Sequence, residues 1–137
     1  MNKATIPVLI SAMALTVIAT SYFLRPPSVS KKAANLQVTV PTLSLTEQNG
    51  ARSYNTNCAS CHGVNAAGKA DLGPSFINKI YEPAHHGDHA FVIAAKNGVR
   101  AHHWRFGNMP PVPSVSDNDL VEIIAYVRAI QRANGIH

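Results

Sequence analysis

The apolar positions of the chain recur at helical spacing most clearly near its C-terminus. These positions are Leu120, Ile123, Ile124, Val127 and Ile130. Spacing of three and four residues gathers side chains on one face of a helix, which is then buried. Ser116 or Asp117 is a favourable cap for the first turn, and Gly135 is a natural stop. Arg128 and Arg132 favour the negative end of the helix dipole.

Two further helices are predicted upstream. The first runs from near Thr46 to about Cys58, with Ser44 and Glu47 spaced as a capping box. The second follows Gly87-Asp88 and stops at Gly98. Its expected buried face consists of Ala90, Phe91, Ile93, Ala94 and Ala95. Because no stretch alternates apolar and polar residues at period two, we predict an all-α fold.

The N-terminal segment has a different pattern. Residues 4–24 contain no charged side chain, and 21 residues of helix span the ~30 Å core of a bilayer. We therefore expect residues 1–25 to form a membrane anchor, with a cleaved signal peptide, cut near Ala19-Thr20-Ser21, as the alternative. Prolines, serines and lysines in residues 26–43 predict a flexible tether. The folded domain is then residues 44–137.

Charge changes this picture little. The chain carries twelve Lys and Arg against seven Asp and Glu, a net charge of +5. Four of the basic residues precede the predicted domain, which holds eight basic and seven acidic residues, a net of +1. No basic stripe with interleaved aromatics is present, so no nucleic-acid partner is expected. A domain this small with few aromatic residues commonly needs a cofactor to complete its core.

The only two cysteines lie in Cys58-Ala59-Ser60-Cys61-His62. This spacing is typical of covalent haem c attachment, in which each thiol adds to a vinyl group and the histidine binds the iron. A disulfide, a thioredoxin-like dithiol or half of a zinc site are the alternatives. A redox dithiol is expected beside a βαβ pattern, which an all-α fold does not contain. A zinc site needs two more Cys or His ligands at a similar short spacing. Haem c, with one iron, is the favoured interpretation.

The chain resembles a monohaem class I cytochrome c over about residues 44–135. In that family a glycine and an aromatic precede the haem-binding turn, and here Gly50, Tyr54 and Cys58 are each four apart. The glycine allows close approach of a C-terminal helix that carries an apolar residue three positions before a tyrosine. Ile123 and Tyr126 match that pair. The resemblance implies a small helical fold with haem as its core.

The resemblance also implies three roles around the iron. A proline carbonyl that follows the haem motif accepts the histidine N–H, and Pro74 in Gly73-Pro74 stands where that proline is expected. His62 and a methionine from the loop before the last helix are then the axial ligands. Met109 is the only methionine in the predicted domain, since the other two lie at positions 1 and 13.

The domain has more histidines than a small electron carrier requires. Five of them are His85, His86, His89, His102 and His103. They are consistent with a second metal site, for example a copper site, or with alternative haem ligation. We favour solvated loop histidines or contacts to the haem propionates, because scattered loop histidines rarely converge on a metal. Arg105 and Trp104, together with Arg100, are candidate propionate partners.

These observations predict a single-electron carrier rather than an enzyme. Its partners are a redox donor and a redox acceptor, and the membrane through the N-terminal segment. The haem domain is expected in the periplasm, anchored to the cell membrane, or released there if the segment is cleaved. The alternatives are a haem subunit of a larger oxidoreductase, a haem enzyme or gas-binding protein with a labile sixth ligand, and a copper-handling protein.

Overall fold

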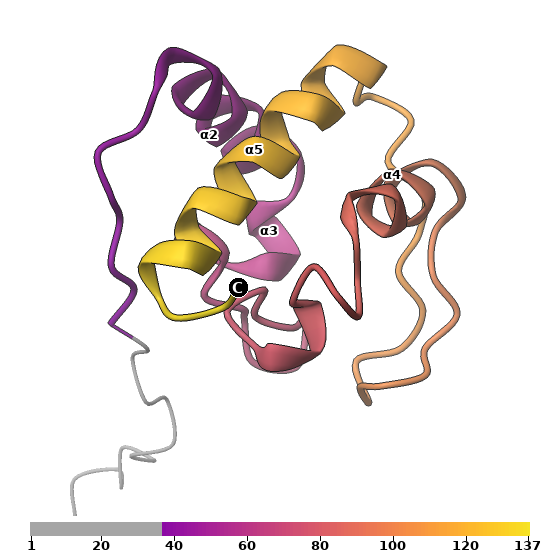
Figure 1. Ribbon diagram of the computed structural model, residues 1–137. Helices are drawn as coiled ribbons and strands as arrows, with labels where there is room; N and C mark the ends of the chain where they lie inside the picture. Colours follow the sequence, from indigo (N-terminus) through magenta and orange to yellow (C-terminus); the bar gives the residue numbers. More distant parts are fainter. Residues whose placement is uncertain (1–36) are drawn as a thin grey trace, which may run out of the picture. The chain divides into compact units, whose positions relative to one another are not determined.

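The computed structural model describes residues 37–137 (Figure 1). The predicted anchor and the first part of the predicted tether lie outside the described residues. The elements in chain order are α2 (Leu45–Asn57), α3 (Ala59–His62), the 3₁₀ turns η1 (Val64–Ala66) and η2 (Lys79–Tyr81), α4 (Asp88–Asn97) and α5 (Asp117–Ala133). Within residues 37–137 the only β-type pairings are two isolated bridges, so this domain is all-α as predicted. Among these residues, none of the helices combines the length and apolarity that crossing a bilayer requires.

The three predicted helices are present, and their caps explain where two of them begin. Ser44 accepts from the backbone N–H of Glu47, whose side chain accepts from the Ser44 N–H in return. Ser116 and Asp119 form the same reciprocal pair at the start of α5. Each capping box satisfies two backbone donors that have no partner within the helix.

Helices α2 and α5 cross at Gly50, and this crossing organises the core (Figure 1). A Cβ atom added at Gly50 would lie 1.9 Å from the carbonyl oxygen of Glu122, so the two backbones touch there. One turn later Tyr54, which is fully buried, packs against Tyr126 with ring centroids 5.4 Å apart. The predicted crossing of the two helices is therefore confirmed.

Helix α4 differs from the prediction. None of its residues is fully buried, and Ile93 is 45% exposed. The reason is that Phe91 and Ile93 line a large cavity, although Phe91 also packs against the edge of the hydrophobic core.

Arg128 also differs from its predicted role at the helix end. Its residue is only 7% exposed. Its guanidinium donates to the Asp88 carboxylate at 2.8 Å, to the Tyr81 carbonyl at 2.8 Å and to the His86 carbonyl at 2.6 Å. Arg128 therefore ties α5 to the segment that precedes α4.

Residues 38–43 pack against the domain and so differ from the predicted flexible tether of residues 26–43. Thr39 exchanges two hydrogen bonds with the Asn134 side chain, at 3.0 and 2.8 Å. Val38 and Leu43 contact the hydrophobic core. The packed part of the chain thus includes these residues, because Asn134 binds the backbone of Thr39 and the core receives Val38 and Leu43.

Candidate haem site

The cysteine motif forms a tight turn at the junction of α2 and α3. Cys58 caps both helices, and the His62 N–H donates to the Cys58 carbonyl at 2.9 Å. This single turn places both sulfurs and the His62 ring along one cavity wall. Burial, followed by the neighbouring Cys61, raises the pKa of the Cys58 thiol to about 11.

His62 is held in one orientation by two neighbours. Its Nδ1 lies 3.0 Å from the Pro74 carbonyl oxygen, which can only accept, so Nδ1 carries the proton. Phe76 stacks on the imidazole with ring centroids 4.3 Å apart. Burial lowers the pKa of His62, partly opposed by the hydrogen bond to Pro74. The neutral ring therefore presents the lone pair of Nε2, the form in which histidine binds metals.

Tyr54 holds the backbone of the residue that follows this histidine. Its hydroxyl donates to the Gly63 carbonyl at 3.0 Å, directly after the motif. Burial, followed by the charges of Cys58 and Tyr126, raises the pKa of Tyr54, so this donor stays protonated. The crossing of α2 and α5 is thereby connected to the position of His62.

A cavity of about 550 Å³ opens beside the motif. Both cysteines, His62 and Met109 line it. Apolar side chains make up much of the remaining wall, among them Phe76, Phe91, Ile93, Val99, Leu120 and Ile123. A porphyrin is flat and apolar and needs two thiols and an imidazole at one wall, so the residues present fit a haem c.

Met109 is presented by a loop with a fixed base. Val99 and Met109 exchange two backbone hydrogen bonds, each 2.9 Å long. Gly98, with φ of +75°, ends α4, and a Cβ there would lie 2.5 Å from the Met109 carbonyl. Only glycine allows this close return of the chain. Met109 is thus held against the end of α4 at the cavity wall.

The candidate propionate partners are placed differently from one another. Trp104 lines the cavity, but its indole N–H donates to the Tyr81 hydroxyl at 3.0 Å. A Trp104 contact to a propionate would require this bond to break. Both arginines are exposed; Arg100 lines the cavity, whereas Arg105 is not part of the lining. By position, Arg100 is the better placed of the two arginines.

Three of the extra histidines converge, contrary to the expectation that they lie scattered. Ring nitrogens of His85, His86 and His103 lie within 4.8 Å of one another. His102 lies beside His103, with ring centroids 4.2 Å apart, and His89 on α4 is outside the cluster. Desolvation, followed by the charges of His102, His86 and His85, lowers the pKa of His103. The neutral form of His103 is thereby favoured.

The family model of cytochrome c matches residues 47–131, more than half of the chain. The chain belongs to the cytochrome c family. It therefore binds a covalently attached c-type haem, and Cys58 and Cys61 are the cysteines that fit this attachment. Members of this family transfer electrons, so this cytochrome c is a haem-based electron-transfer protein. Comparisons with curated proteins and with solved structures gave no match.

Sequence reasoning missed Phe76 as a residue of the site. Phe76 contacts His62 and also packs edge-on against Tyr54, Tyr81 and Phe91, with centroids 5.1–6.4 Å apart. It lies in a loop, where no periodic pattern marks a side chain as buried. The available signal was its position two residues after Pro74.

Proposed function

We propose that this cytochrome c is a single-electron carrier in which His62 and Met109 are the axial ligands of the haem iron. The observation that carries the proposal is the hydrogen bond from His62 Nδ1 to the Pro74 carbonyl. It leaves Nε2 as the donor atom at a cavity that Met109 also lines. Bound haem supplies an iron that cycles between two oxidation states.

The protein's contribution is to hold both ligands in place through the redox cycle. His62 is 93% shielded from solvent and is stacked on Phe76, so its ring has little freedom to rotate. Met109 is pinned through its backbone to Val99 and is followed by Pro110 and Pro111, which fix φ. A loop that is already ordered loses little entropy when its side chain binds. Two retained ligands leave no coordination position for a substrate.

Carbon monoxide binding tests this assignment. The reduced wild-type protein is expected to bind carbon monoxide poorly, because a sixth ligand must first leave. Met109→Ala is expected to bind it readily and to have a lower potential, since the thioether favours the reduced iron. The matched control is His102→Gln, which changes a neighbouring exposed donor of the same loop and should behave as the wild type. Ready binding by the wild-type protein would contradict the carrier function and favour an enzyme or a gas sensor.

We further propose that the haem domain lies on the outer side of the cytoplasmic membrane, anchored by residues 1–25. The uncharged run of residues 4–24 between Lys3 and Arg25 supports this proposal. Its donor and acceptor are then redox proteins or complexes at that surface. After a high-salt wash the haem protein should remain in the membrane fraction. A soluble species that begins near Tyr22 would instead identify a cleaved signal.

A further inference from the structure

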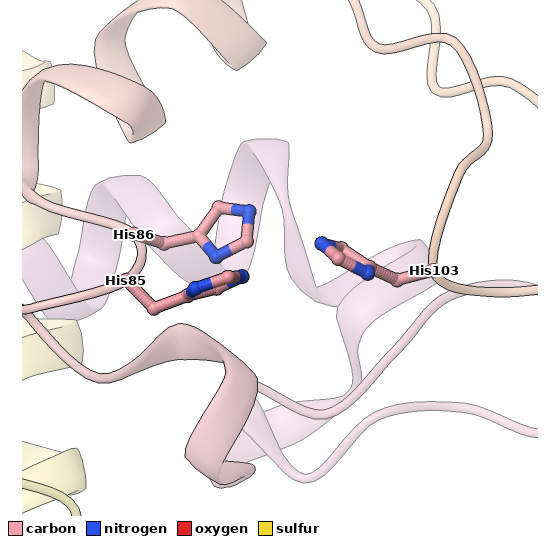
Figure 2. Close-up of side chains that lie close together, drawn as sticks. All are labelled: His85, His86 and His103. Carbon is pink, nitrogen blue, oxygen red and sulfur yellow. The ribbon is translucent and has the colours of Figure 1, made fainter.

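We propose that His85, His86 and His103 form a binding site for a late first-row divalent cation, Zn²⁺ or Cu²⁺, separate from the haem iron. Figure 2 shows His85 and His86 reaching from one loop toward His103 on another. One nitrogen from each ring lies within 4.8 Å of the other two. The site thus joins two segments that are 17 or more residues apart in the chain.

The spacing of the rings matches a shared ion. A metal–nitrogen distance of about 2.0–2.1 Å at a tetrahedral angle places coordinated ring centroids roughly 5 Å apart. The three centroid distances are 4.8 Å for His85–His86, 5.6 Å for His85–His103 and 5.4 Å for His86–His103. Binding therefore needs rotation of the side chains and no displacement of the loops.

His86 is oriented as metal-binding histidines are. Its Nδ1 lies 2.6 Å from the Ile80 carbonyl oxygen, so Nδ1 carries the proton and Nε2 is left as the donor atom. The backbone N–H groups of His85 and His86 both donate to the Glu82 carbonyl, at 3.0 and 2.8 Å. Arg128 holds the His86 carbonyl at 2.6 Å. This half of the site is therefore fixed before an ion arrives.

The loop that carries His103 is closed by its own hydrogen bonds. Val99 and Met109 pair at its base, and the Ala101 N–H donates to the Asn108 side chain at 2.9 Å. His85 and His103 are exposed, so an ion can enter from solvent. Three imidazoles and no carboxylate select zinc, copper or nickel over magnesium or calcium. A fourth position is left for water or for His102.

The test is zinc binding to the full-length, haem-loaded chain purified without a histidine tag. Haem-loaded protein is required because His86 and His103 also line the haem cavity. We expect one zinc per haem in metal analysis after dialysis, with an affinity measured by competition against a chelator. His85→Gln and His103→Gln should each weaken zinc binding by about 10–100-fold or more. Loss of a partner that only orients a metal ligand already costs that much, and these substitutions remove a ligand itself. His85 is exposed and does not line the haem cavity, so His85→Gln should leave the haem spectrum unchanged.

The matched control is His89→Gln, which removes a histidine of the same segment outside the cluster and should leave zinc affinity unchanged. Absence of stoichiometric zinc in the wild-type protein would overturn the proposal, as would an equal loss of affinity in His89→Gln. Retained affinity in His103→Gln together with its loss in His102→Gln would overturn the assignment of ligands. Displacement of His62 or Met109 from the iron by zinc, seen in the haem spectrum, would likewise contradict a separate site.

Discussion

The crossing at Gly50 allows a quantitative prediction for Gly50→Ala. The added Cβ would lie 1.9 Å from the Glu122 carbonyl oxygen and 3.0 Å from the Ile123 nitrogen, so the backbones of α2 and α5 must separate by about 1 Å. A gap of that size removes a quarter to a half of each affected dispersion contact, roughly 3 kcal/mol over Tyr54, Tyr126 and Ile123. Alanine regains up to about 1 kcal/mol of helix propensity. We expect a net loss of about 2 kcal/mol.

This loss is measured by denaturant unfolding of the haem-loaded protein, monitored by far-UV circular dichroism. In thermal unfolding, the melting temperature should fall by roughly 10 °C. The matched control is Gly87→Ala, where φ is negative and an added Cβ meets only the Pro83 carbonyl oxygen at 3.5 Å. That variant should change the free energy of unfolding by less than about 1 kcal/mol. If Gly50→Ala proved as stable as the control, the helix crossing described above would be incorrect.

Two further predictions concern polar groups of α5. Hydrogen bonds from the Ser116 hydroxyl and N–H, and from the Ser53 hydroxyl, lower the pKa of Asp119. Their contribution to the stability of the folded state is therefore fully present above the unfolded pKa of about 3.9. It is lost as the pH falls through the lower pKa of the folded state. Ser116→Ala removes the N-cap hydroxyl of α5 and should cost about 1 kcal/mol in unfolding experiments at pH 7. The difference from the wild type should shrink at pH 3, and a difference independent of pH would refute this. Arg128→Leu removes a buried donor of several hydrogen bonds and should cost at least about 2 kcal/mol. Arg132→Ala, which breaks an exposed pair with Glu47 at 3.4 Å, should cost less than about 1 kcal/mol in the same measurement, and equal losses would contradict the role of Arg128.

The sequence was sufficient for the helices because their signals are local. Ser44 and Glu47 form the predicted capping box, and Ser116, one of the two predicted caps of α5, forms a second box with Asp119. The crossing of α2 and α5 was implied by the resemblance to cytochrome c, in which a glycine before the haem-binding turn permits backbone contact. Helix periodicity, however, marks only the face that is turned inward. It did not distinguish a face against protein from the face of α4 that lines the haem cavity.

The remaining contacts are non-local, and the sequence contains no pattern for them. Arg128 has the position of a residue that complements the helix dipole, yet Asp88, Tyr81 and His86, to which it donates, lie 40 or more residues away. The convergence of His85 and His86 with His103 depends on how two irregular loops fold over the cavity. The indole of Trp104 likewise donates to Tyr81, a partner 23 residues away.

The most direct test of the central claim is the sulfur-to-iron charge-transfer band in the absorption spectrum of the oxidised protein. With His62 and Met109 as axial ligands, the wild-type protein shows this band and Met109→Ala lacks it. His103→Gln removes one of the two histidines that lie nearest to Met109 in the sequence, and this variant retains the band. Absence of the band from the oxidised wild-type protein, or its survival in Met109→Ala, would contradict the assignment of Met109.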